Sequence, residues 1–300
     1  MREYHEFTMK RIVVATDFSD ASYGAIHYAK QLGCRFSAKL LVVHVIDMTR
    51  SLQVDGMPTE PLPDRIDAAE DELQRISSSL AFDGVRCSTA LRVGGIRETV
   101  SGLIKERDAD LLVIATSGKG YKGGQGLGSV AEMLLRSVSC PVLTVARLVR
   151  QDAYEATHER RVLFPTDFSN TSRAALSYTA HLTRHLDGRL VLLHVDPFGT
   201  PPDALPHEKE FREFTREIGS VVSECITRAG DPARTIVKVS AEKHADFIVM
   251  GVQRSGAIGI PPSELFAFDV IRLANCPVFT LSAEHQAQPF NHKLQATARA

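Results

Sequence analysis

The chain has 300 residues, of which 44% are hydrophobic and 24% are charged, a balance typical of proteins that bury a sizeable core. Its 35 basic and 36 acidic side chains leave a formal net charge of −1. A chain so close to neutral has no overall positive charge to attract nucleic acid or an anionic membrane. No apolar run approaches the roughly 18 residues that a membrane span needs, and the charged first residues are unlike a secretory signal. We therefore expect a cytoplasmic protein that binds neither nucleic acid nor membrane.

Strand-like and helix-like segments alternate along the first half of the chain. Continuous apolar runs predict buried strands, and apolar positions three or four residues apart predict helices. In chain order we expect strands at 12–16 and 40–46, separated by a helix that Ser19 or Asp20 caps and Gly33 follows, then a helix at 66–80, a strand at 86–93, a helix at 96–103, a strand at 110–116, a helix at 129–138 and a strand at 141–146. This alternation predicts a parallel sheet covered by helices on both faces, with ligands bound at the carboxyl ends of its strands.

The sequence repeats itself once. Two T-D-F-S segments place Asp17 opposite Asp167, and two apolar runs that end in His-Val place His44 opposite His194, both at an offset of 150 residues. The two C-P-V segments further along are 136 residues apart, so the second copy is 14 residues shorter (150 − 136) in one segment. A duplication with one deletion explains both offsets.

These offsets divide the chain into two similar domains. We expect the first domain at 1–148, a linker at 149–159, the second domain at 160–284 and a tail without regular structure at 285–300. The missing residues of the second copy fall in a polar loop, where a change of length is tolerated. The strands that begin at the two C-P-V segments are predicted to be edge strands that pair with each other within the chain, and a homodimer stays open as an alternative.

A glycine-rich segment joins the predicted strand at 110–116 to the predicted helix at 129–138. A helix N-terminus stabilises an anion, and glycine lets the backbone approach a phosphate closely. The segment has no G-x-x-x-x-G-K-[ST] sequence, and its G-x-G-x-x-G lacks an acidic residue about 20 positions later. From these residues alone, a phosphate-binding loop and a flexible surface loop are equally open interpretations.

The spacing of Gly118 and Gly128-Ser129, with nine residues between the two glycines, resembles the ATP-binding members of the universal stress protein family when it is taken with the T-D-F-S and C-P-V segments. The resemblance extends over both copies. It implies an α/β fold with two tandem, doubly wound parallel-sheet domains of the adenine-nucleotide alpha hydrolase-like type. It also implies that the first domain binds ATP, ADP or AMP, with Mg²⁺ as a possible companion.

The resemblance implies a set of site residues in the first domain. The base and sugar would be held by Ala15, Thr16, Asp17, Val45, Ile114 and Ala115, and the phosphates by Gly118, Gly128, Ser129 and Val130. The family has a glycine where this chain has Ala115, which we expect to narrow the site. Lys119 and Lys122 lie in the same loop, where solvated lysines are favoured over phosphate ligands.

The second copy departs from this pattern. Thr166, Asp167 and Gly251 match the base side of the site, but Glu264 and Leu265 stand where the first copy has Gly128 and Ser129. A carboxylate about 5 Å from a phosphate would cost on the order of 3 kcal/mol. We therefore expect no nucleotide in the second domain.

The remaining polar side chains receive structural interpretations. His44 and His194 are expected to orient the backbone near the site rather than to bind a metal, and Ser19 and Ser169 to cap helices. Five separated cysteines without a C-x-x-C pair indicate buried free thiols. The spacing of Gly118 and Gly128-Ser129, taken with Asp17, makes a nucleotide-responsive stress protein the leading hypothesis, and no catalytic residue is identified. A tandem scaffold without nucleotide and a slow ATPase are the alternatives.

Overall fold

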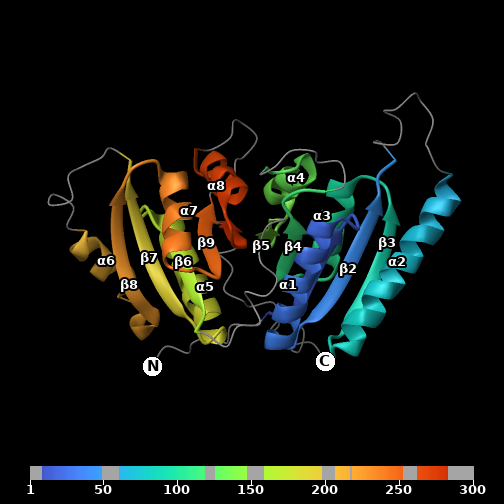
Figure 1. Ribbon diagram of the computed structural model, residues 1–300, viewed down its shortest axis with the longest axis horizontal. Helices are drawn as coiled ribbons and strands as arrows, with labels where there is room; N and C mark the ends of the chain where they lie inside the picture. Colours follow the sequence, from blue (N-terminus) through green and yellow to red (C-terminus); the bar gives the residue numbers. More distant parts are fainter. Residues whose placement is uncertain are drawn as a thin grey trace, which may run out of the picture.

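The structure is a computed structural model that describes residues 9–48, 61–118, 126–146, 159–197, 207–216, 218–252 and 262–282, with the side chains of 262–265 left aside. It is an α/β protein in which each half of the chain contributes five strands to one ten-stranded sheet (Figure 1). The predicted fold class is confirmed. Across the described ranges, no helix combines the length and apolar character that crossing a bilayer requires.

The first repeat follows the predicted order of elements. It comprises β1 (Arg11–Thr16), α1 (Asp20–Phe36), β2 (Lys39–Ile46), α2 (Leu62–Phe82), β3 (Cys87–Val93), α3 (Ile96–Glu106), β4 (Leu111–Ala115), α4 (Ser129–Ser137) and β5 (Val142–Val145). The second repeat comprises β6 (Arg161–Pro165), α5 (Asn170–His185), β7 (Arg189–Asp196), α6 (Glu208–Thr215), a 3-10 turn at Gly219–Val221, β8 (Val222–Ala229), α7 (Pro232–Glu242), β9 (Phe247–Val252), α8 (Pro262–Leu273) and β10 (Val278–Ser282). The expectation that the missing residues of the second copy fall in the polar loop is wrong, because most of the difference lies in the helix that follows it: α6 has 8 residues where α2 has 21.

The strand order is β3-β2-β1-β4-β5-β10-β9-β6-β7-β8. Within each repeat every pairing is parallel, whereas β5 and β10 pair antiparallel, with Leu143 opposite Phe279. The chain moves outward from β1 to β2 and β3, and then returns to the other side of β1 for β4. The strand order therefore reverses between β1 and β4, where a doubly wound sheet opens at the carboxyl ends of its strands.

Alternating residues of each strand enter the two hydrophobic cores on the two faces of the sheet. Ile12 and Val14 of β1 face α1 and α2, while Val13 between them faces α3 and α4. On α2, the predicted apolar face is confirmed because Ala69, Leu73, Ile76 and Leu80 are buried. The second repeat has the same arrangement, with α5 and α6 on one face and α7 and α8 on the other.

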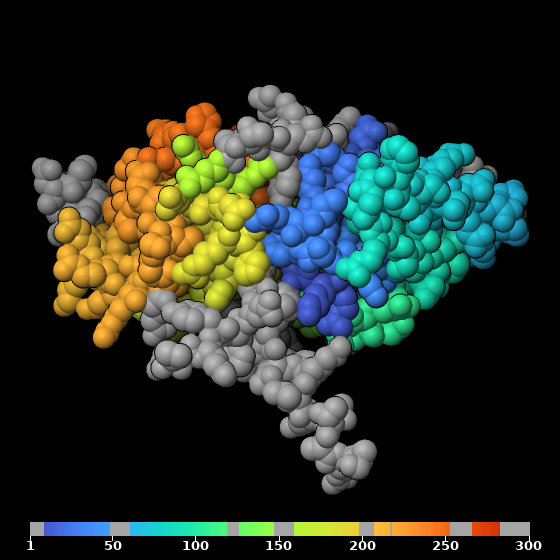
Figure 2. Space-filling model, turned by 90° about the horizontal axis from the view of Figure 1, so that it is seen from below, coloured from blue at the N-terminus to red at the C-terminus, as the bar shows by residue number. Residues whose placement is uncertain are grey.

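Helices of the two repeats also touch on both faces of the joined sheet. The Arg35 side chain of α1 bonds Asp187, and the Phe36 ring stacks on His185, which brings the ends of α1 and α5 side by side (Figure 2). On the opposite face, the Arg136 guanidinium of α4 lies 5.0 Å from the centre of the Phe268 ring of α8. The helix that begins at the glycine-rich loop is therefore packed against its counterpart in the other repeat.

One helix end differs from the prediction. Gly33 lies inside α1, which continues to Phe36 and ends at Ser37 with a φ of +51°. A β-carbon on Gly33 would lie 2.6 Å from Cδ1 of Leu40, so this glycine permits close packing of α1 on β2 rather than ending the helix. At the start of α4, Gly128 is the N-cap and Ser129 is the first helical residue.

The inferred linker at 149–159 and the tail at 285–300 lie outside the described residues, apart from Glu159. The five cysteines are free, as expected, but they are not uniformly buried: Cys140 is buried, whereas Cys34 and Cys225 are exposed.

Candidate functional site

A cavity of about 1040 Å³ opens at the carboxyl ends of the strands of the first repeat, at the reversal of strand order. Every one of the predicted site residues lines it: Ala15, Thr16, Asp17, Val45, Ile114, Ala115, Gly118, Gly128, Ser129 and Val130. These residues come from β1, β2, β4, the glycine-rich loop and the start of α4. The fold thus brings together positions that are more than 100 residues apart in the sequence.

The T-D-F-S segment forms a tight, internally bonded turn between β1 and α1. The Phe18 N–H donates to Oγ1 of Thr16 at 3.0 Å, and the Ser19 N–H and hydroxyl donate to Oδ1 of Asp17 at 3.1 and 2.6 Å. The Ser19 hydroxyl also caps α1 by accepting from the Ser22 N–H at 3.2 Å, as predicted. These bonds fix the Asp17 carboxylate at the edge of the cavity.

Phe18 has a φ of +60°, a left-handed conformation that is rare for a bulky side chain. Its equivalent in the second repeat, Phe168, has the same φ, and its N–H donates to Thr166 in the same way at 2.9 Å. The strain is therefore built into both repeats. It turns the phenyl ring back onto the end of the neighbouring strand, where Phe18 and His44 stack with their ring centres 4.3 Å apart.

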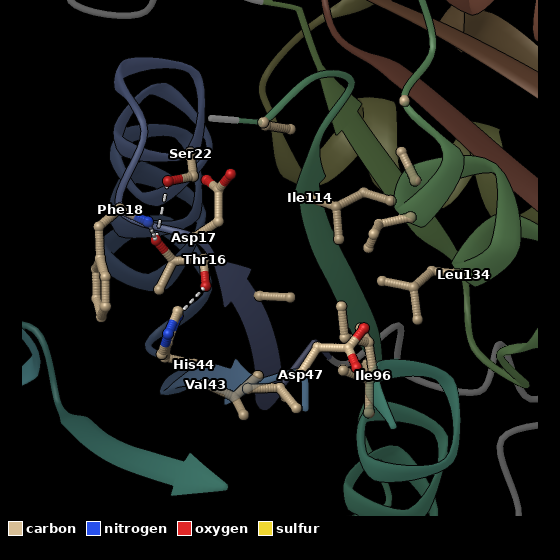
Figure 3. A pocket seen from close by; sticks show the side chains of 18 of the residues that line it. Thr16, Asp17, Phe18, Ser22, Val43, His44, Asp47, Ile96, Ile114 and Leu134 are labelled. Carbon is tan, nitrogen blue, oxygen red and sulfur yellow. Dashed lines mark hydrogen bonds between the residues drawn. The ribbon is translucent and has the colours of Figure 1, made fainter. Parts of the chain in front are cut away.

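His44 acts on the backbone, as predicted. Its Nδ1 lies 2.8 Å from the carbonyl oxygen of Thr16 and must donate a proton to it, which ties the end of β2 to the end of β1 (Figure 3). His194 makes the same bond to Thr166 in the second repeat, also at 2.8 Å. Among the described residues, no group of three or more His, Cys, Asp or Glu side chains could hold a metal ion.

The two ends of the glycine-rich loop are placed by backbone contacts. The Gly128 N–H donates to the carbonyl of Thr116 at 2.7 Å, which closes the loop across the end of β4. This N–H is therefore already bonded within the loop and is not a donor that a phosphate could use at the start of α4. The helix N-terminus carries a partial positive charge directed into the cavity wall.

The lining of the cavity extends over both faces of the sheet, and we call the two parts of it the α1/α2 lobe and the α3/α4 lobe. In Figure 3, Thr16 and Asp17 stand between Phe18 and His44 on one side and Ile114, Leu134 and Ile96 on the other. The α3/α4 lobe is lined by Val45, Ile96, Val100, Ile114, Val130 and Leu134. The α1/α2 lobe is lined by Phe18, Tyr23, His44, Arg65, Ala68, Ala69 and Glu72.

The sequence interpretation placed no ligand contact in the α1/α2 lobe. The repeated T-D-F-S and His-Val segments already contained Phe18 and His44, so their recurrence was an available signal. Tyr23 and Glu72 carried no such signal because their contact joins two helices: the Tyr23 hydroxyl donates to Glu72, and Glu72 also accepts from Arg75 at 2.9 Å. Burial and this carboxylate raise the pKa of Tyr23 to about 12.

The second repeat keeps the turn but fills the corresponding space with side chains. The Phe168 ring stacks on His194 at 4.7 Å and on His207 at 5.8 Å. Phe211 and Phe214 of α6, both buried, meet the same ring edge-on at 5.1 and 5.5 Å. Burial by itself would raise the pKa of Asp167, but hydrogen bonds from Ser169 and Ser172 bring it below its ordinary value.

Gly251 of β9, which stands where the first repeat has Ala115, is explained by packing. A β-carbon there would lie 3.0 Å from both the Thr171 carbonyl oxygen and Cβ of Ala175. Helix α5 therefore packs so closely on β9 that a β-carbon at this position would require the neighbouring atoms to shift. The side chains of Lys119, Lys122, Glu264 and Leu265 lie outside the described part of the chain, so the prediction of a degenerate second phosphate side stays a prediction.

Comparison with known proteins identifies the family. The model of the universal stress protein family matches the chain twice, over residues 8–146 and 159–281. The chain belongs to the universal stress protein family. It is a tandem member, because the family model matches each half of the chain separately.

Single-domain relatives of this family align with about half of the chain. A universal stress protein of Methanocaldococcus jannaschii is 29% identical over 46% of this chain and 82% of its own length, and one of Thermus aquaticus is 32% identical over 45% and 98%. The crystal structure of a universal stress protein from Archaeoglobus fulgidus aligns with 92% of this chain and 99% of its own, with a TM-score of 0.74 and 21% identity. That structure supports the two-domain fold.

Proposed function

We propose that this universal stress protein binds ATP or a related adenine nucleotide in its first repeat and responds to the occupancy of that site by regulating a partner. The observation that carries the proposal is the convergence of the ten predicted residues on one cavity at the reversal of strand order. The side chains and backbone groups at the two ends of the α3/α4 lobe also suit an adenine nucleotide. Apolar side chains can hold a base at one end, and a helix N-terminus preceded by glycine can hold phosphates at the other.

Binding is tested first on the purified protein. Denaturing it and analysing the released small molecules by mass spectrometry would identify a bound nucleotide, and calorimetry with ATP, ADP and AMP, each with and without Mg²⁺, would rank them. We expect micromolar binding of at least one of these nucleotides. Absence of heat up to millimolar concentrations, together with no released nucleotide, would contradict the proposal and favour a scaffold that binds none.

A double substitution tests the phosphate end of the site. Gly128→Glu with Ser129→Leu reproduces the residues of the second repeat in the first, and a carboxylate near phosphate costs on the order of 3 kcal/mol, roughly a hundredfold in affinity. Binding should fall by that factor for ATP and less for adenosine, which has no phosphate. The matched control is Ser137→Leu at the far end of α4, which leaves the cavity lining unchanged.

The alternatives differ in what they require of the cavity. A slow ATPase would release phosphate continuously, and the release would be lost in Asp17→Ala, the carboxylate beside the glycine-rich loop.

The same proposal includes three further statements: the two repeats pair through β5 and β10 within one chain in solution, the protein is cytoplasmic, and the second repeat binds no nucleotide. A monomer by light scattering would support the intramolecular pairing over a homodimer.

A further inference from the structure

Both repeats place a phenylalanine ring against a histidine ring at the carboxyl ends of their first two strands. The ring centres are 4.3 Å apart for Phe18 and His44 and 4.7 Å for Phe168 and His194, with interplanar angles of 27° and 29°. In each pair the phenylalanine has the same left-handed φ of +60°. Both Phe–His pairs are therefore the same structural feature, and what covers each of them can be compared directly.

In the second repeat a third ring lies on this pair. The His207 imidazole is nearly parallel to Phe168, with an interplanar angle of 25°, and its centre is 4.4 Å from that of His194. Its Nδ1 is buried and has no hydrogen-bond partner among the described residues, so packing of the ring, rather than a polar contact of that nitrogen, accounts for its position. A planar nitrogen heterocycle thus fits against the Phe–His pair, in the chain's own structure.

In the first repeat the same pair lines the α1/α2 lobe of the cavity. The helix on that face of the sheet presents Ala68 and Ala69 to the cavity, whereas α6 of the second repeat presents Phe211 and Phe214 to Phe168. At the position of Tyr23, the second repeat has Arg173, whose guanidinium lies 5.0 Å from the centre of the Phe214 ring. The helix on this face thus presents small side chains to the lobe in the first repeat and phenylalanine rings to Phe168 in the second.

We propose that the α1/α2 lobe binds a planar nitrogen-containing aromatic ring against Phe18 and His44, in the place that His207 takes in the second repeat. Tyr23, Arg65 and Glu72 line the same lobe and supply polar groups at the edge of such a ring. Stacking on aromatic side chains stabilises a bound base. The ring can belong to a second small molecule or to the second base of a dinucleotide that also occupies the α3/α4 lobe; the latter case rests on the function proposed above.

The test uses two probes and calorimetry on the full chain. Free adenine is titrated into protein saturated with ATP, and separately a dinucleotide in which four phosphates join two adenosines is compared with ATP. We expect either one further equivalent of adenine or a dinucleotide affinity at least tenfold above that of ATP. The first outcome indicates a separate ligand, and the second a dinucleotide.

Substitutions on α2 locate the binding. Ala68→Phe places a ring in the lobe, as α6 does in the second repeat, and should weaken the adenine or dinucleotide effect at least tenfold while leaving ATP affinity unchanged. Ala81→Phe, another exposed alanine of α2 that lies outside the cavity lining, is the matched control. Ala69→Phe fills the lobe from its buried side and provides a second variant.

The proposal is overturned if neither probe shows the expected binding, or if Ala68→Phe and Ala81→Phe have equal effects. If the protein does not bind ATP at all, adenine is titrated into the unliganded chain instead. If adenine binds and Ala68→Phe weakens that binding, the proposed ring site in the α1/α2 lobe is supported although the nucleotide proposal fails. The failure of one proposal can therefore be told from the failure of the other.

Discussion

Gly118 lies directly against the carboxylate of Asp17. A β-carbon at Gly118 would overlap Oδ2 of Asp17 and lie 3.3 Å from its Cγ. The other carboxylate oxygen, Oδ1, accepts two bonds from Ser19 at the start of α1. The predicted phosphate loop therefore begins in direct contact with the T-D-F-S turn, although Gly118 and Asp17 are 101 positions (118 − 17) apart in the sequence.

We therefore expect Gly118→Ala to weaken nucleotide binding at least tenfold, because the methyl group must displace either the loop or the Asp17 carboxylate. Calorimetry with ATP measures the effect. Gly102→Ala is the matched control, since a β-carbon there meets nothing within 4 Å and lies in the interior of α3. It should leave binding unchanged and stabilise the fold by about 0.5–1 kcal/mol. Equal binding by both variants would contradict the prediction.

Exchanging glycine and alanine at the equivalent strand positions of the two repeats should have unequal effects on stability. Gly251→Ala introduces a methyl group 3.0 Å from the Thr171 carbonyl oxygen and from Ala175, which should cost roughly 1–3 kcal/mol of unfolding free energy. Ala115→Gly removes a methyl group that the first repeat accommodates, and it should widen the nucleotide cavity at a smaller cost. Urea denaturation of both variants tests this. A tolerated Gly251→Ala would show that α5 can move away from β9.

A single charged side chain between β5 and β10 should separate the two repeats. Thr144 is 1% exposed, and its hydroxyl donates across the β5–β10 ladder to the Val278 carbonyl at 3.1 Å. A lysine there would be buried without a partner, so we expect Thr144→Lys to destabilise the protein by about 3 kcal/mol or more and to promote self-association through the released strand edges. Light scattering and thermal denaturation measure both effects. Thr89→Lys, on the exposed side of the outer strand β3, should behave like the wild type.

The lowered pKa of Asp167 predicts that the stability of the folded protein depends on pH. Its pKa in the folded protein is below the ordinary value of 3.8, so the ionised carboxylate contributes stability that is fully present above that value. The contribution is lost as the pH falls through the folded pKa. The loss of Tm caused by Asp167→Asn should therefore be larger at pH 7 than at pH 3. Asp67→Asn, which removes an exposed carboxylate of α2, controls for net charge and should show no such change.

The space that His207 fills in the second repeat should accept a small aromatic molecule when the His207 side chain is removed. His207→Ala removes a ring that packs on Phe168 and His194, which should lower the Tm by a few degrees because the space is left without packing contacts. Added imidazole should restore part of the lost Tm in this variant and not in the wild type. His244→Ala, another histidine of the same repeat, has none of these ring contacts among the described residues and serves as the control. If imidazole raised the Tm of all three proteins equally, the rescue would not be specific to this space.

The ten site residues that line the first cavity came from the resemblance to the universal stress protein family, whereas the sequence by itself determined the repeat, the alternation of strands and helices and the caps at Ser19 and Ser169. These features follow from the period of apolar residues and from local bonds, which neighbouring residues dictate. The tertiary structure decided the rest: that Gly33 and Gly251 serve packing, that the Gly128 N–H closes its own loop, and that the cavity has a second lobe on the α1/α2 face. Those facts depend on how closely separate elements approach one another, and no local pattern in the chain records that distance.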